Sequence, residues 1–133
     1  MKIINVNGKD YALKLTIGSI KNLEKRLGKN PLNYFIFDVE NYPEITPFAI
    51  MFHACLVNMN HGITEDESDA ILSDWVAEYA KAHEDAPDNA PDKDYLVGLI
   101  NLITEVFQDA GFLPKNKEEK KTAEKGAKNS KNK

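Results

Sequence analysis

The sequence predicts an α+β domain that is mostly α, with an N-terminal β-hairpin packed on about four to five helices and a disordered C-terminal tail. Three observations lead to this fold class. Apolar and polar residues alternate around Asn7-Gly8, a dipeptide that favours a hairpin turn because both residues tolerate positive φ. Helical spacing of apolar residues dominates from Thr16 to Gly111. Beyond Pro114 the only apolar residues are two alanines.

The hairpin covers residues 3–15, and its register stays open. A two-residue loop places Val6 across from Lys9, whereas a four-residue loop places Val6 across from Tyr11 and pairs apolar side chains better. The two registers differ by two residues, so both bury the same face. That face consists of Ile4, Val6, Tyr11, Leu13 and Leu15. An isolated hairpin is marginal in water, so this one is expected to pack on the helices.

The first helix is expected between an N-cap at Thr16 and a left-handed glycine at Gly28. Its buried stripe is Ile17, Ile20, Leu23 and Leu27. The run from Pro31 to Phe37 is too short and too evenly apolar for its spacing to distinguish helix from strand. Residues 41–43 end that run.

Three further helices follow. Thr46-Pro47 predicts a helix start, a cap followed by proline at the first helical position. The segment from Phe48 to Met59 is apolar almost all round, which is typical of a central helix. Thr64 opens the next helix, with acids near its positive end, and its buried stripe is Ile71, Leu72, Trp75, Val76 and Tyr79. The last helix is expected from about Asp92 to Ala110 after an acidic loop, with Leu96, Leu99, Ile100, Ile103, Val106 and Phe107 on its main face.

Charge divides the chain into two parts. Residues 114–133 hold eight lysines and three glutamates, a net charge of +5, which leaves −9 on residues 1–113. We therefore predict a single globular domain over residues 1–113 and a disordered lysine-rich tail over 114–133. The acidic globule argues against a dedicated nucleic-acid-binding domain. It suits a partner with a basic surface.

Cysteine content and hydropathy favour a cytoplasmic protein. One cysteine, Cys55, allows no internal disulfide, which fits a reducing compartment. The first residues lack the apolar stretch of a signal peptide, and no window approaches the ~20 apolar residues of a membrane span.

No motif predicts catalysis, a cofactor or a metal. His53, Cys55 and His61 are the nearest approach to a metal site. However, residues two apart on a helix point ~200° apart, so His53 and Cys55 cannot share an ion. The acids of 66–74 lack the spacing and the glycine of a calcium loop. A small metal-dependent enzyme is therefore the weakest hypothesis, and we expect no catalytic, cofactor-binding or metal-binding residues.

Four large apolar or aromatic residues are the candidates for binding a partner. Tyr95 and Leu102 lie off the main face of the last helix, and Trp75 and Tyr79 form an aromatic pair one turn apart on the preceding helix. Ordinary core packing explains most such stripes, but a partly exposed groove for a partner helix or a self-association surface would use the same residues.

The opening of the chain carries a group of motifs: Ile-x-Val-Asn-Gly-Lys-x-Tyr-x-Leu at residues 4–13, residues 17–20 and 23–28 of the following helix, and Asn30-Pro31-Leu32. In these motifs the chain resembles the small tail assembly chaperones of long-tailed bacteriophages. The segment from His53 to Leu56 and the acidic helix near Thr64 extend this resemblance. These are packing and turn residues.

The resemblance implies a function without chemistry. Such a chaperone binds the long helical tape measure protein and keeps it soluble, helps to recruit the tail tube protein, and is absent from the finished virion. Multimers that wrap the tape measure protein, and a longer form made by ribosomal frameshifting, also fit the family. This implies a location in the bacterial host cytoplasm. The alternative is an acidic adaptor or decoy that binds a basic partner protein, because residues 1–113 carry −9.

Overall fold

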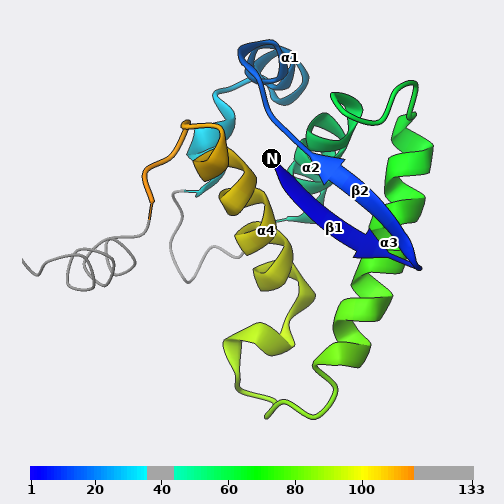
Figure 1. The fold of residues 1–133 in the computed structure, drawn as a ribbon. Helices are drawn as coiled ribbons and strands as arrows, with labels where there is room; N and C mark the ends of the chain where they lie inside the picture. Colours follow the sequence, from blue (N-terminus) through cyan, green and yellow to red (C-terminus); the bar gives the residue numbers. More distant parts are fainter. Residues whose placement is uncertain (36–43, 116–133) are drawn as a thin grey trace, which may run out of the picture.

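The computed structural model describes residues 1–35 and 44–115. In chain order, its elements are strands β1 (Lys2–Val6) and β2 (Lys9–Leu13), helix α1 (Ile17–Leu27), the 3-10 helix η1 (Pro31–Phe35), helices α2 (Ile45–Val57) and α3 (Glu65–Ala82), the 3-10 helix η2 (Pro91–Lys93) and helix α4 (Tyr95–Asp109). The predicted fold class, a hairpin on a helical body, is confirmed (Figure 1).

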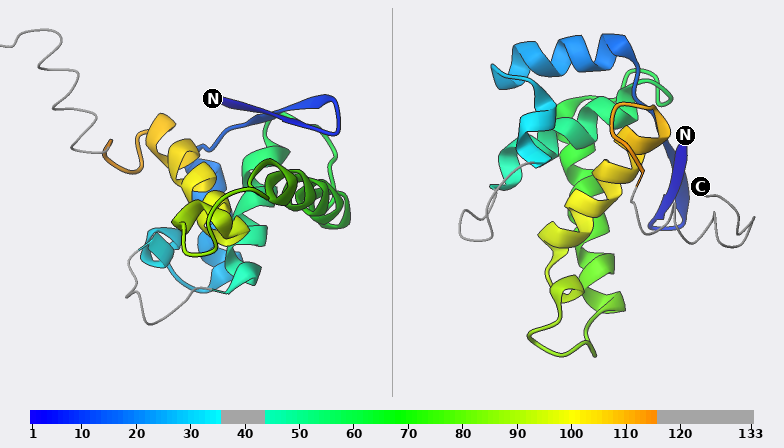
Figure 2. Two further views of the ribbon diagram at one scale, coloured as in Figure 1. Left: turned by 90° about the horizontal axis from the view of Figure 1, so that it is seen from below. Right: turned by 90° about the vertical axis from the view of Figure 1, so that its left-hand side faces the viewer.

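Figure 2 shows the hairpin as a separate layer on one side of the helices, with α1 crossing one end of the antiparallel pair α3 and α4. Helix α2 is central, since it contacts α1, α3, α4 and β2. The apolar run predicted to be the central helix therefore is central. None of the helices within residues 1–35 and 44–115 is long and apolar enough to cross a bilayer.

The hairpin adopts the two-residue register, with Val6 opposite Lys9 and Ile4 opposite Tyr11. Asn7 and Gly8 both have left-handed backbones, with φ of 56° and 81°, as a type I′ turn requires. Side chains of α3 hold this turn: Asn7 donates its backbone N–H to Glu78 over 2.6 Å and its amide to Asp74 over 3.1 Å. The predicted face is the inner one, with Tyr11 partly exposed and the other four side chains buried.

Helix α1 begins and ends where its caps predict. Thr16 and Ser19 form a reciprocal capping box, and Gly28 ends the helix with φ of 77°. The predicted stripe is wrong at one position, because Ile17 is 65% exposed. It is the first residue of the helix, where helical spacing places it on the buried side but no tight packing follows.

Two predicted helix starts are also wrong. Helix α2 begins at Ile45, with Glu44 at its N-cap and no side-chain cap, so Thr46 lies inside the first turn. Pro47 is tolerated there because the first N–H groups of a helix have no intrahelical acceptor. Helix α4 begins at Tyr95 and not near Asp92, because Asp94 caps it through Leu96 N–H over 2.8 Å.

The buried apolar side chains form one cluster that draws on both strands and all four α-helices of the described residues: Ile4, Val6, Leu13, Leu15, Leu23, Phe48, Met51, Phe52, Ala54, Cys55, Leu56, Leu72, Leu96, Leu99, Leu102, Ile103, Val106 and Phe107. The segment 36–43 and the tail from residue 116 lie outside the described residues. The predictions for Ile36, Phe37 and residues 41–43, and for nearly all of the tail, therefore stay predictions.

Candidate functional site: a groove between two helices

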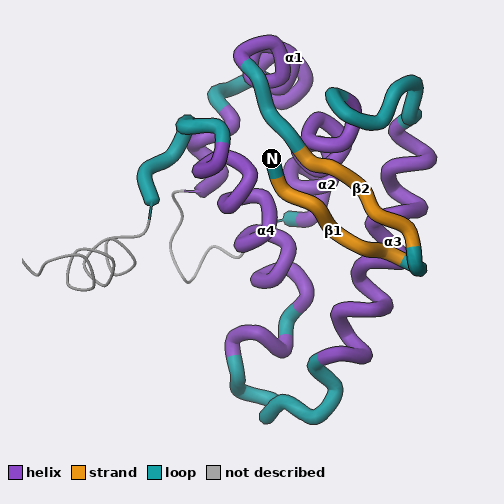
Figure 3. Tube along the Cα trace, viewed as in Figure 1, coloured by secondary structure: helices purple, strands orange, loops and turns teal. Residues whose placement is uncertain are grey.

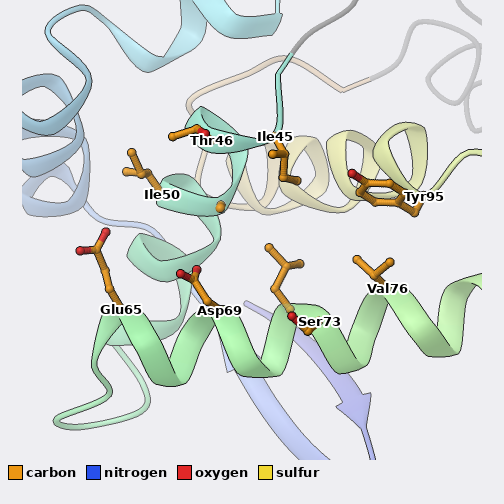
Figure 4. Close-up of a pocket in the computed structure, with 10 residues that line it drawn as sticks. Ile45, Thr46, Ile50, Glu65, Asp69, Ser73, Val76 and Tyr95 are labelled. Atoms are coloured by element: carbon orange, nitrogen blue, oxygen red, sulfur yellow. The ribbon is translucent and has the colours of Figure 1, made fainter.

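A surface groove of about 620 Å³ separates the first turns of α2 from the first three turns of α3. Figure 4 shows Ile45, Thr46 and Ile50 facing it from α2, and Ser73 and Val76 from α3. Tyr95, the first residue of α4, closes one end. The α2 side of the groove is lined mostly by apolar residues because α2 is apolar almost all round, so that its outer side stays apolar after the core is filled.

The groove has two chemically different ends. Glu65 and Asp69, one turn apart on α3, lie at one end, whereas Val76 and Tyr95 lie at the other (Figure 4). Arg26 of α1 pairs with Glu65, while Asp69 is exposed. From Glu65 to Val76 the helix rises by about 16 Å, or three turns. The groove therefore matches a short apolar helix that carries a positive charge near one end.

The four residues predicted to bind a partner do not lie together. Tyr95 lines the groove. Leu102 is 8% exposed and belongs to the core, so its predicted place off the main face of α4 is wrong. Leu102 has helical spacing from Leu99 and Val106, so the sequence itself allows a buried stripe through these three residues. Ile100, which is only partly buried, does not belong to that stripe.

Tyr79 of α3 packs against Gly98 of α4, and Trp75 stacks on Tyr79. Their rings stack with centroids 5.2 Å apart, and Tyr79 stacks in turn on His83 at 4.0 Å. The Tyr79 hydroxyl donates to the Asp92 carbonyl over 2.6 Å. Burial raises the pKa of Tyr79, and the charges of Asp92 and Asp94 raise it further, which keeps this donor protonated.

Sequence reasoning missed most of the groove. Ala49 and Ile50 belong to the predicted central helix that is apolar almost all round, Ile45 falls just before its predicted start at Thr46-Pro47, and Asp69 is one of the acids of 66–74 for which no ligand role is predicted. A signal was present in the sequence, since a helix that is apolar all round needs neighbours all round. Among residues 1–35 and 44–115, the structure places no helix over the N-terminal part of α2 on this side.

His53 is a structural residue. Its Nε2 lies 3.1 Å from the Ile63 carbonyl, which can only accept, so this nitrogen carries the proton. Its Nδ1 then accepts from Arg26 over 3.3 Å. The described residues contain no group of three His, Cys, Asp or Glu side chains that could hold a metal ion.

Cys55 is expected to resist thiol reagents in the folded protein. The residue is 0% exposed within α2, and burial raises the pKa of its thiol, which disfavours the reactive thiolate. A chromogenic disulfide reagent at about pH 8 should modify the folded chain only as fast as it unfolds. Denatured protein, the control, should react at once with one equivalent. Rapid modification of folded protein would contradict this burial.

The chain matches no protein-family model, no curated protein and no solved structure in the comparisons made.

Proposed function

We propose that this chain is a non-enzymatic tail assembly chaperone of a long-tailed phage. It holds an apolar helical segment of the tape measure protein in the groove between α2 and α3. The observation that carries the proposal is the groove itself, with apolar side chains along about three helical turns and carboxylates at one end. The resemblance of the hairpin and the first helix to this family supports the same function.

The physical logic is that of a helix binding in a groove. An apolar helical chain aggregates alone because its apolar stripe stays in water. When the groove covers about three turns of that stripe, the apolar surface that drives aggregation is removed from water. The affinity comes from apolar side chains of the bound helix that recur at helical spacing. The acidic exterior keeps the complex soluble, since residues 1–113 carry −9. Such a protein acts in the bacterial host cytoplasm, assists addition of the tail tube protein, and is absent from the mature virion.

Co-expression tests the proposal. The tape measure protein of the same phage should be more soluble when made with this chain, and the two should co-purify. Ile45→Glu should lower the affinity at least tenfold, because it places a charge in the apolar part of the groove. Ile45 is the first residue of α2, where a carboxylate favours the helix, so the fold should be retained.

Ile17→Glu is the matched control. Ile17 is also an exposed apolar residue at the first position of a helix, but it lies on α1 outside the groove. Its variant should bind and solubilise as the unmodified chain does. Unchanged solubility with the unmodified chain, or equal effects of the two substitutions, would contradict the proposal.

The salt dependence of binding distinguishes the proposed chaperone from the alternative function, an acidic adaptor or decoy. The alternative function is favoured by the exposed carboxylates along α3, including Asp66, Asp69, Asp74 and Glu78. Binding through these charges should collapse as the Debye length falls from about 10 Å at 0.1 M salt to about 3 Å at 1 M. Binding through the apolar groove should persist.

A further inference from the structure

The two edges of the hairpin differ in their hydrogen bonding. In a two-residue hairpin the residues beside the turn form a hydrogen-bonded pair, and such pairs then alternate along the strands. Val6–Lys9, Ile4–Tyr11 and Lys2–Leu13 are therefore the bonded pairs. The intervening residues turn their backbone N–H and C=O groups outward, Ile3 and Asn5 on β1 and Asp10 and Ala12 on β2.

Contacts from the end of α2 and from the turn after it cover the outer edge of β2 at Ala12 and just beyond the strand, and they confirm this alternation. The Ala12 carbonyl accepts from the Asn60 amide over 3.0 Å. Beyond the strand, the Lys14 N–H donates to the Cys55 carbonyl over 2.9 Å, and the Lys14 carbonyl accepts from the Asn58 amide over 2.8 Å. These are the outward groups that the register predicts.

The outer edge of β1 has no such cover. Within residues 1–35 and 44–115, the backbone groups of Ile3 and Asn5 have no hydrogen-bond partner. The Ile3 side chain is 53% exposed. Proline and charged side chains are the devices that usually protect an open edge. β1 has no proline, and its one charged residue, Lys2, lies at the end of the strand and pairs with Glu105. Figure 3 shows these two strands as the whole sheet of the described residues.

We propose that a second copy of this chain pairs with this edge, β1 against β1, antiparallel about a twofold axis at Ile4. Ile3 of each copy then lies opposite Asn5 of the other, and these two pairs exchange four N–H···O=C bonds. The two Ile4 side chains meet on the buried face. The product is a continuous four-stranded sheet in the order β2, β1, β1, β2 with the helices of both copies on one side.

The charges along the edge favour a second copy in this orientation. The cation of β1, Lys2, is at one end, where it pairs with Glu105. The carboxylates of Asp74 and Glu78 are at the other end, on Asn7. The twofold axis places Lys2 opposite Val6 of the second copy, beside the carboxylates of that copy. It also keeps the two Lys2 residues about 14 Å apart along the strands. The same strand segment of the second copy satisfies all four open backbone groups, the N–H and C=O of Ile3 and of Asn5. An isologous interface requires such self-complementarity.

A matched pair of proline variants tests this interface. Asn5 and Asp10 lie directly opposite each other, and both variants lose the same side-chain bond, Asn5 Nδ2 to Asp10 Oδ1 at 2.8 Å. Each proline replaces an outward N–H, which an edge strand tolerates. Asn5→Pro removes a donor that the dimer uses, whereas Asp10→Pro leaves the edge of β1 intact.

Light scattering after size exclusion should show the unmodified full chain moving from 15.0 kDa toward twice that mass with rising concentration. A small interface predicts a Kd on the order of 100 μM. Asp10→Pro should dimerise in the same range and Asn5→Pro should stay monomeric, with equal circular dichroism. A monomer throughout at about 1 mM, or the same mass curve for both variants, would overturn the proposal.

If a variant fails to fold, hydrogen exchange of the backbone amides in the unmodified chain tests the same interface. Protection of the Ile3 and Asn5 amides should rise with protein concentration while that of Asp10 does not change. Protection that is independent of concentration, or that appears only when a different protein is added, would assign the edge to something other than a second copy.

Discussion

Replacing Phe107 with alanine is expected to lower the free energy of unfolding by about 4 kcal/mol. The side chain is fully buried and meets Phe35 edge-on at 5.0 Å and Phe112 at 6.4 Å. The loss combines buried apolar surface, an unfilled cavity and two aromatic contacts. Because a domain of this kind has only about 5–15 kcal/mol in total, a large part of its stability is lost.

Urea unfolding followed by the fluorescence of Trp75, the single tryptophan, measures this effect. Asn101→Ala is the control, since Asn101 is an exposed residue of the same helix. It should change the stability by no more than about 0.5 kcal/mol. A loss below about 1.5 kcal/mol for Phe107→Ala would mean that η1 and the end of α4 do not pack as described.

Gly98→Ala is expected to destabilise the protein by about 1–3 kcal/mol, although alanine is the better helix former by about 1 kcal/mol. A Cβ at residue 98 of α4 would lie 2.4 Å from Cε2 of Tyr79. That ring cannot yield easily, because it is stacked between Trp75 and His83 and its hydroxyl is bonded to Asp92. The ring and the two helices must therefore move apart.

The sign of the effect should reverse when the ring is removed. In a Tyr79→Ala background, Gly98→Ala should stabilise the chain by about 0.5–1 kcal/mol, because only the helix propensity remains. Chemical denaturation of the four proteins of this double-mutant cycle gives the coupling between the two positions. An equal loss in both backgrounds would show that Tyr79 is not the cause.

Local signals in the sequence account for the elements and most of their ends. Thr16 and Gly28 bound α1 because their capping bonds are made within a few residues of chain. Asn7-Gly8 specifies the turn for the same reason, since left-handed φ values are a property of those two residues. Apolar runs likewise identified α2 as the central helix, because burial on every side requires neighbours on every side.

Local signals failed where a distant contact decided the outcome. Pairing of apolar side chains favoured the four-residue hairpin loop, but the tight turn, bonded by Asp74 and Glu78 of α3, has the other register. Ile17 fits the stripe of α1 by spacing, yet residues 1–35 and 44–115 leave it exposed. The predicted main face of α4 included Ile100 and left out Leu102, whereas the structure buries Leu102 and leaves Ile100 only partly buried.

The sequence by itself determined the order of the elements, the N-caps of α1 and α3 and the inner face of the hairpin, because each depends on interactions between near neighbours. Only the tertiary structure decided which side of α2 the described residues leave open, that Tyr95 closes the resulting groove, and which edge of the hairpin those residues leave uncovered. Those features depend on where helices far apart in the chain stop short of one another. No spacing of residues along one segment encodes that distance.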